Sequence, residues 1–288
     1  MYTNQPTNQP TNQPTNQPTN QPMVIALAAD LGYQTQVETL IKSLCYHHSH
    51  LKIYLFQKTF PDEWFDLWCN KLILLSSEII PVKVNMDFSK FKTLDHINET
   101  GFFRYLIPHL EDERVLYLDS DIVVDANLAE MYWQDFNNVP LLAVEDYVLN
   151  HRSLYSNFDI KPYFNSGVLL INNSLLDSRI IDLLIEVNEK FPDFKSGDQD
   201  ALNLVFKDCW GRLPLEYNYQ TDAIVHYIYR EDKKSFAKER GFLDIKPKII
   251  HYTSHCKPWR NDFTQLMREK YWFYYSLEWK DILLRHPR

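Results

Sequence analysis

Glycine is scarce in this sequence. The six glycines, at positions 32, 101, 167, 197, 211 and 241, are never closer together than 14 residues. Neither the Gly-x-Gly-x-x-Gly fingerprint of dinucleotide-binding folds nor a P-loop can be written with that spacing. If a nucleotide binds to this protein, something other than a glycine-rich loop must hold its phosphates.

Other signals are also missing. The four cysteines (Cys45, Cys69, Cys209 and Cys256) show no Cys-x-x-Cys spacing, and the N-terminus has no basic stretch followed by an apolar run, which predicts reduced thiols in a cytoplasmic protein. No stretch approaches the roughly 18 to 20 uninterrupted apolar residues of a membrane span. With 30 Lys and Arg against 38 Asp and Glu, the formal charge is −8, which argues against a nucleic-acid partner held by electrostatics.

A repeat occupies the N-terminus. Residues 3–22 are five copies of Thr-Asn-Gln-Pro, without charge or large apolar side chains. Such a segment cannot bury enough surface to offset the entropy of ordering it, so residues 1–22 are predicted to be a disordered tail. An iterated CAAC unit read in triplets encodes this repeat, and slippage in such a tract would switch the reading frame. The pattern resembles phase-variable genes for surface structures in host-adapted bacteria. The alternative is an ordinary flexible linker.

The body alternates between apolar strands and helical patterns. Strands are expected at residues 23–29, 52–56, 79–84 and 114–118, and helices at 34–48, 62–75 and near 101–110. This alternation predicts an α/β fold with a mostly parallel sheet covered by helices on both faces. Farther along, strands are expected at 141–144 and 168–171, and helices at 175–191 and 198–206. The predicted catalytic domain spans residues 23–263.

Residues 264–288 are predicted to form a C-terminal helical extension. The segment is dense in aromatic residues and ends with an excess of cations. One interpretation is a peripheral contact with the inner leaflet of a membrane, where a lipid-anchored acceptor would be presented. The other is a helix packed on the body, since aromatic stripes at helical spacing are usually core.

Acidic residues follow two of the predicted strands. Asp30 follows the first strand, and Asp119 and Asp121 follow the strand 114–118. In an open α/β sheet, ligands bind outside the carboxyl ends of the strands. Carboxylates at i and i+2 suit one shared divalent cation, which would neutralise a diphosphate where no glycine loop exists.

A histidine follows another apolar strand. His251 comes after Lys248-Ile249-Ile250 and lies shortly before Lys257, whose ammonium could reach phosphate oxygens. An imidazole added to two carboxylates suits Mn²⁺ better than Mg²⁺, which stays the alternative. The pattern favours a metal site formed by Asp119, Asp121 and His251; the alternative is a turn with two solvated aspartates and a structural histidine.

Several motifs together resemble the family 8 glycosyltransferases, in particular the bacterial lipooligosaccharide galactosyl- and glucosyltransferases. They occur in the family's order over residues 23–260. The matching segments are Ala28-Ala29-Asp30 with Tyr33, Arg104 in Phe-Arg-Tyr-Leu, residues 115–121, residues 164–172, Asp198-Gln199-Asp200, and His251-Tyr252 with Lys257-Pro258-Trp259. The resemblance implies a GT-A type nucleotide-sugar-binding fold and a retaining transfer of hexose from a UDP-sugar.

The resemblance also implies a site. Asp30 and Tyr33 would hold the uridine, Asp119, Asp121 and His251 would bind Mn²⁺ with the diphosphate, and Lys257 would contact phosphate. Arg104, Asn165, Asp198 and Gln199 would line the donor sugar. The full implied set for donor and cofactor is Ala29, Asp30, Gly32, Tyr33, Arg104, Asp119, Ser120, Asp121, Asn165, Ser166, Asp198, Gln199, His251, Ser254 and Lys257. The implied catalytic residues are Asp198, Gln199 and Asp200. The expected partners are a UDP-hexose and a glycolipid acceptor such as a lipooligosaccharide core.

Two positions depart from the family pattern. Gly32 stands where Asn is common, and Ser254 stands where Gly is usual.

Two other functions fit parts of the sequence. Residues 118–123 also fit the Asp-x-Asp-x-Val strand end of haloacid-dehalogenase-type phosphatases, but Leu202 occupies the position of that family's later acid. A non-catalytic sugar-binding module would suit the aromatic content, but gives no reason for the three predicted metal ligands to occur together.

Overall fold

The computed structural model describes residues 21–91, 99–147, 160–229, 238, 241–242, 244–260 and 266–287. The predicted N-terminal tail lies outside the described residues, except for its last two positions. The first strand begins at Met23, the residue after the last repeat.

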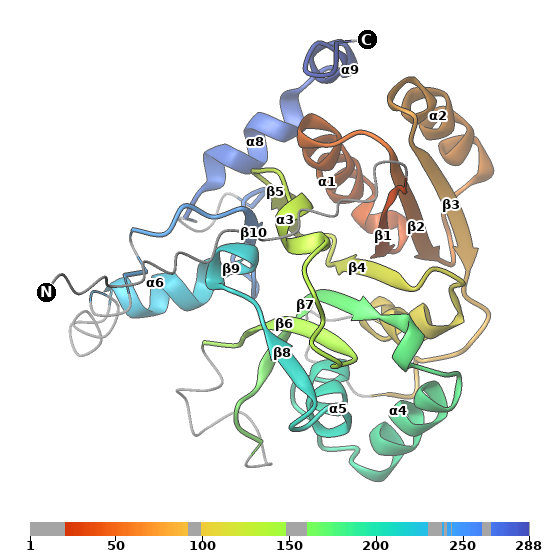
Figure 1. Cartoon of the computed structure of the whole chain (residues 1–288), viewed down its shortest axis with the longest axis vertical. Helices are drawn as coiled ribbons and strands as arrows, with labels where there is room; N and C mark the ends of the chain where they lie inside the picture. Colours follow the sequence, from red (N-terminus) through yellow and green to blue (C-terminus); the bar gives the residue numbers. More distant parts are fainter. Residues whose placement is uncertain are drawn as a thin grey trace, which may run out of the picture.

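A seven-stranded sheet forms the centre of the fold (Figure 1), in the order β3-β2-β1-β4-β7-β6-β8. Neighbouring strands from β3 to β4 run parallel, whereas β7 runs antiparallel to both β4 and β6. The mostly parallel sheet was predicted, but the reversal of β7 was not. The strands are β1 (Met23–Ala28), β2 (Leu51–Gln57), β3 (Glu78–Lys83), β4 (Arg114–Leu118), β6 (Leu141–Glu145), β7 (Phe164–Asn172) and β8 (Trp210–Arg212).

Helices cover both faces of this sheet, as the alternating pattern predicted. Successive residues of β1 pack on opposite faces: Ile25 and Leu27 lie in one core, and Val24 and Ala26 in the other. Such a strand is buried on both faces, which explains its continuous apolar run. The helices that cover the first core are α1 (Gln34–His47), α2 (Asp62–Leu72) with η2 (Ile73–Leu75), α3 (Ala129–Tyr132), α6 (Thr221–Tyr229) and α9 (Trp279–Leu283). The helices that cover the second core are η3 (Glu99–His109), α4 (Arg179–Lys190) and α5 (Asp198–Val205).

The helix expected at 175–191 begins later than predicted. Residues Asn173–Leu175 form a 3-10 turn, η4, and α4 starts only at Arg179. Asp177 Oδ1 accepts a hydrogen bond from the backbone N–H of Arg179 at 2.8 Å. Aspartate in this position offers the chain a local alternative to helix, which explains the late start.

A second, three-stranded sheet has the order β5-β10-β9. It contains β5 (Ile122–Val124), β9 (Tyr219–Gln220), which follows η5 (Leu215–Tyr217), and β10 (Ile249–His251). His251 pairs with Ile122 in the antiparallel β5–β10 register. This small sheet therefore brings the predicted histidine ligand beside the end of the Asp119–Asp121 turn.

The C-terminal segment forms α8 (Arg268–Ser276) and α9. In Figure 1, α8 lies beside α1 and β5. Tyr271 and Tyr274 are buried, whereas Trp272, Phe273 and Tyr275 are about two-fifths exposed. The packed-helix interpretation therefore holds for one face of α8, and the other face leaves aromatic rings at the surface.

Candidate functional site

The sheet topology positions the acidic residues. The order β2-β1-β4 places β1 and β4 side by side and parallel, so their carboxyl ends share one edge, at the point where the strand order reverses. Crevices at such a switch point are the usual ligand sites of open α/β sheets. Asp30 follows β1 here, and Asp119 and Asp121 lie in the turn that leads from β4 to β5.

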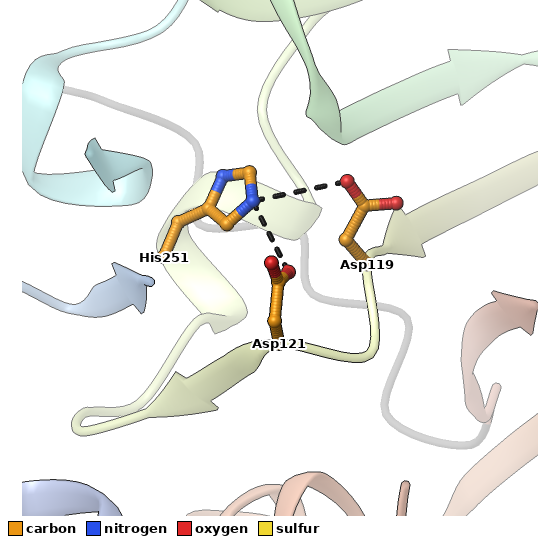
Figure 2. A group of neighbouring side chains, drawn as sticks. All are labelled: Asp119, Asp121 and His251. Carbon is orange, nitrogen blue, oxygen red and sulfur yellow. Dashed lines mark ion pairs between the residues drawn. The ribbon is translucent and has the colours of Figure 1, made fainter. Parts of the chain in front are cut away.

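The three predicted metal ligands converge (Figure 2). One ligand atom from each of Asp119, Asp121 and His251 lies within 4.8 Å of the others. His251 Nε2 is 3.2 Å from Asp121 Oδ1 and 3.8 Å from Asp119 Oδ2. Adjacent ligands of an octahedral ion at about 2.1 Å are about 3 Å apart. A divalent cation therefore fits this group with only small adjustments of the side chains.

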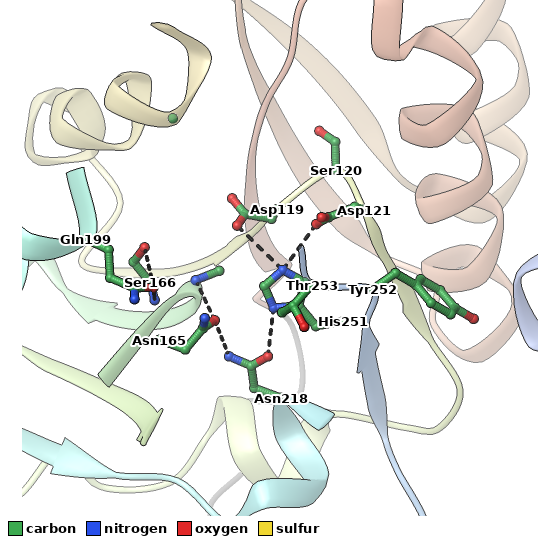
Figure 3. Close-up of polar contacts among 12 residues, drawn as sticks. Asp119, Ser120, Asp121, Asn165, Ser166, Gln199, Asn218, His251, Tyr252 and Thr253 are labelled. Atoms are coloured by element: carbon green, nitrogen blue, oxygen red, sulfur yellow. Dashed lines mark hydrogen bonds and ion pairs between the residues drawn. The ribbon is translucent and has the colours of Figure 1, made fainter. Parts of the chain in front are cut away.

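Hydrogen bonding orients the imidazole toward the carboxylates. His251 Nδ1 lies 2.9 Å from Asn218 Oδ1, and Asn218 in turn donates to Asn165 Oδ1 at 2.8 Å (Figure 3). An amide oxygen only accepts, so Nδ1–H donates to Asn218, and this hydrogen bond leaves the His251 Nε2 atom facing the two acids. An outer partner of this kind typically fixes a histidine for metal binding.

Asp121 is held in its ionised form. Burial by itself would raise the pKa of this carboxyl, but Lys257 and His251 together hold the pKa well below its usual range. Lys257 Nζ is 2.5 Å from Asp121 Oδ2. Apart from the His251 Nε2 atom 3.2 Å away, the buried Asp121 Oδ1 has no hydrogen-bond partner among the described residues. A buried charged oxygen without a donor is costly, and a cation beside it would remove that cost.

Gly167, in β7, lets the cluster close. A Cβ added here would lie 2.2 Å from His251 Cε1 and 2.7 Å from Asp119 Oδ2. The Gly167 N–H donates to Asn165 Oδ1 at 3.1 Å, and its carbonyl accepts from the Asp119 N–H at 2.9 Å. Only glycine fits between the two ligands. The sequence motif contained this residue, but its role became visible only in three dimensions.

Arg104 connects the metal group to the predicted sugar site. Its guanidinium lies 2.8 Å from Asp119 Oδ1 and 3.1 Å from Asp198 Oδ2, and it donates to Ser166 Oγ at 2.9 Å. Although burial opposes the charge, the two carboxylates raise the pKa of Arg104 above its ordinary value. Burial, countered mainly by Arg104, raises the pKa of Asp198 to about 6. Asp198 is thus a buried carboxyl poised closer to neutrality than an ordinary aspartate.

Gln199 belongs to a network that includes a residue the sequence reasoning missed. Gln199 Oε1 accepts from the Ser166 N–H at 2.9 Å, and Gln199 Nε2 donates to Asp146 Oδ2 at 3.1 Å. Asn165 also donates to Asp146 Oδ2, at 3.3 Å. Asp146 is buried at the end of β6. No motif distinguishes it in the sequence; a strand-end acid was the only signal available.

Asp200 has a different environment from Asp198. Its Oδ1 accepts from the Tyr163 hydroxyl at 2.7 Å, and its Oδ2 accepts from the N–H groups of Lys195 and Ser196 at 3.0 and 2.8 Å. Both oxygens are therefore used to hold the loop before α5. This geometry favours a structural role and gives no support to the predicted catalytic one.

The predicted nucleotide contacts lie around the turn after β1. Ala29 is buried, and η1 (Leu31–Tyr33) carries Gly32 and Tyr33. Burial, followed by the nearby Asp121, raises the pKa of Tyr33 to about 12, so the phenol stays protonated at neutral pH. A Cβ at Gly32 would lie 3.0 Å from Asp30 Oδ1. Ser120 is turned inward, because its hydroxyl donates to the Ala28 carbonyl at 2.8 Å.

Ser254 departs from the family pattern in a strained position. Its φ is +65°, in the left-handed region that favours glycine. The usual glycine at this point is therefore explained by the backbone, and Ser254 keeps the same turn with a side chain. Its Oγ accepts weakly from the Cys256 N–H, at 3.4 Å.

The geometry can be set beside known proteins. Residues 24–262 match the profile described as Glycosyl transferase family 8. The chain belongs to this family. A second profile, described as PT disordered repeat, matches residues 3–23 of this family 8 protein.

Three proteins illustrate the relationship. Glycosyltransferase GlyE of Streptococcus pneumoniae serotype 4 (strain TIGR4) is 36% identical over 271 residues, which cover 90% of this chain and 62% of GlyE. Its crystal structure superposes with a TM-score of 0.73 over 92% of this chain and 63% of that one, at 34% identity. The galactosyltransferase LgtC, solved with donor and acceptor sugar analogs, has a TM-score of 0.76 at 24% identity, over 90% of this chain and 100% of LgtC. Lipopolysaccharide 1,2-glucosyltransferase of Escherichia coli K12 is 23% identical over 248 residues, 82% of this chain and 72% of that protein.

These comparisons confirm the predicted family and the GT-A type fold. The chain spans between 36% and 63% of the length of the first pneumococcal relatives. Membership of glycosyl transferase family 8 does not favour the phosphatase or the sugar-binding module. Within the described residues, no helix is both apolar enough and long enough to span a membrane.

Proposed function

We propose that this family 8 member is a retaining, Mn²⁺-dependent hexosyltransferase that uses a UDP-sugar, with Mg²⁺ as the alternative ion. The observation that carries the proposal is the convergence of Asp119, Asp121 and His251 within 4.8 Å at the carboxyl end of β4. Two carboxylates and an imidazole suit Mn²⁺. The sequence has no glycine loop for a diphosphate, and an ion held by this group would supply the positive charge instead, together with Lys257.

The bound ion would supply a Lewis acid that stabilises charge on the departing UDP. The chain's own residues do the rest. Lys257 would add a second positive charge beside the diphosphate, at a side chain that is only 9% exposed. Arg104 fixes Asp119 and Asp198 in one arrangement. Asp30 and Tyr33 would hold the uridine by a hydrogen bond and by ring stacking.

Retention of the anomeric configuration follows one of two routes, a covalent double displacement or attack from the leaving group's own side. We favour same-side attack, with the departing phosphate oxygen as base. Asp198 is paired with Arg104 at 3.1 Å, so it suits a sugar-hydroxyl acceptor better than a nucleophile, and Gln199 is an amide. A glycosyl adduct trapped on Asp198, Asp200 or Asp146 would contradict this route.

A donor assay tests the proposal. The protein is incubated with Mn²⁺ and either UDP-galactose or UDP-glucose, and UDP release is followed; galactose is the favoured sugar. We expect Asp121→Ala to abolish release, because it removes a ligand and strands Lys257. Asp112→Ala is a matched control, since Asp112 pairs with Lys52 at 3.0 Å before β4, away from the metal group. Undiminished release by Asp121→Ala would refute the proposal, and phosphate release from simple esters without UDP would support the phosphatase.

We further propose that the acceptor is a surface glycolipid such as a lipooligosaccharide core, and that the enzyme works at the cytoplasmic face of the inner membrane. The similarity to a lipopolysaccharide glucosyltransferase supports the acceptor class. The partly exposed Phe273 and Tyr275 on α8 support a peripheral contact. Vesicles of anionic lipid should sediment the native protein but not Phe273→Ser/Tyr275→Ser; equal sedimentation would exclude this surface.

The repeat supports a proposal on regulation. We infer that residues 3–22 are translated from an iterated CAAC tract whose slippage varies expression of the enzyme. The coding DNA decides the matter, because uniform CAAC units are expected and mixed synonymous codons would refute the idea.

A further inference from the structure

The loop formed by residues 252–260 carries much of the proposed donor chemistry. It starts directly after the metal ligand His251 and contains Lys257, whose Nζ donates to the Tyr252 carbonyl at 2.6 Å and pairs with Asp121. It also contains Trp259, whose ring meets Tyr33 edge-on with centroids 6.1 Å apart. The loop thus borders both the predicted phosphate contact and the predicted uracil contact. It belongs to no helix or strand that could hold it in place.

Helix α8 contacts this loop at successive points. The indole N–H of Trp272 donates to the Pro258 carbonyl at 3.0 Å. The ring of Tyr271 packs on Trp259, with centroids 5.1 Å apart. At the start of the helix, the Tyr252 hydroxyl donates to the Met267 carbonyl at 2.8 Å. These contacts bracket Lys257 on both sides in the sequence.

Other residues of α8 fix the helix to the body. The Tyr274 hydroxyl donates to Asp125 Oδ1 at 2.6 Å and lies 2.8 Å from His47 Nε2. Lys270 pairs with Asp125 at 2.7 Å, and Lys42 donates to the Tyr275 carbonyl at 2.7 Å. Because α8 is anchored to α1 and to the end of β5, it can transmit their rigidity to the loop.

We infer that α8 is a strut for the donor loop, and that Trp272 is a positioning residue for UDP-sugar binding. The inference rests on the proposed function, because it assumes that Lys257 and Tyr33 contact UDP. Trp272 acts through Pro258, the residue between Lys257 and Trp259, so loss of its hydrogen bond would free both contacts at once. Two of the metal ligands, His251 and Asp119, keep supports outside the loop, Asn218 and Arg104, and Asp121 keeps its contact with His251.

The same Trp→Phe substitution, made at two positions, separates this role from general packing. Trp272→Phe keeps a six-membered aromatic ring and removes the N–H bonded to Pro258 together with the rest of the five-membered ring. Trp279→Phe, in α9, is the matched control, because the Trp279 indole N–H has no hydrogen-bond partner among the described residues and its ring packs on Trp68, with centroids 5.8 Å apart. Both variants and the native chain are titrated with UDP at saturating MnCl₂ and with MnCl₂ alone. Their thermal unfolding is measured as well.

We expect Trp272→Phe to weaken UDP binding, and to raise the KM for the UDP-sugar, by about three- to tenfold, the range for one lost hydrogen bond. Its affinity for Mn²⁺ alone should stay within about twofold of native, and Trp279→Phe should bind UDP as the native chain does. The inference is overturned if Trp272→Phe binds UDP normally, or if both variants lose UDP affinity in proportion to their loss of thermal stability. Failure of the native chain to bind UDP with Mn²⁺ would instead refute the proposed function, together with the inference that depends on it.

Discussion

Gly167 offers a sharp test of the metal group, because a single methyl group should disable it. In Gly167→Ala the new Cβ would lie 2.2 Å from His251 Cε1, whereas ordinary contacts begin at 3.4 Å. The imidazole or β7 must therefore move by about 1.2 Å along that line. The same Cβ would lie 2.7 Å from Asp119 Oδ2, so this carboxylate would also have to move. Displacement of reacting or binding groups by about 1 Å commonly costs on the order of 100-fold.

The expected result has two parts. Overpacking should lower the free energy of unfolding by about 1 to 3 kcal/mol. Mn²⁺ affinity, measured by titration against the electron paramagnetic resonance signal of free Mn²⁺, should fall by about 100-fold or more, which is about 2.7 kcal/mol. UDP release should fall in parallel, because the ligands no longer converge.

Gly211→Ala is the matched control. Its Cβ would lie 2.3 Å from Leu142 Cδ2, a comparable clash, but in β8 at the edge of the sheet and against a flexible side-chain end. This variant should lose stability and retain native Mn²⁺ affinity. If Gly167→Ala binds Mn²⁺ as tightly as the native chain, or if Gly211→Ala loses as much affinity, the reasoning from convergence is wrong.

Two further predictions concern stability. Because the pKa of Asp198 is raised to about 6 in the native state, the native state binds this proton more tightly than the unfolded chain, whose aspartates titrate near 3.9. The free energy of unfolding should therefore fall as pH rises from about 4 to 6, by up to about 3 kcal/mol. Asp198→Asn should remove that contribution in urea titrations of metal-free protein, and an unchanged pH profile would contradict the assignment. Ser254→Gly should raise the free energy of unfolding by up to about 1 kcal/mol, since φ is +65°, whereas Ser254→Val should lower it; equal stabilities would show that the turn is unstrained.

The sequence predicted the first half of the fold closely. The apolar run of β1 and the helical spacing of Val37, Leu40 and Leu44 in α1 are local patterns set by burial, and the structure confirms them. The strands β5, β8 and β9 were missed, because segments of two or three residues carry no periodicity. The reversed direction of β7 was missed as well, since strand direction depends on connections that no local pattern records.

The metal group could be predicted because its members lie at the ends of apolar strands: Asp119 and Asp121 follow β4, and His251 ends β10 of the second sheet. Its supporting residues could not. Asn218 precedes a strand of two residues and meets His251 only through the β9–β10 pairing. The resemblance implied a catalytic role for Asp200 as well as for Asp198, but their carboxylates face different partners. The direction of a side chain in the first turn of a helix depends on tertiary contacts, which the local sequence does not record.

The antiparallel pairing of β5 with β10 joins Ile122 to His251, two positions separated by almost half of the chain. Contacts of such long range form late, because closing the intervening chain carries an entropic cost before any pairing offsets it. During synthesis, β1 to β4 can assemble while the histidine is still to be added. The nascent protein therefore acquires the framework of its sheet well before it can hold a metal ion, and ion binding reports that the chain has been translated at least to His251 and that β10 has paired with β5.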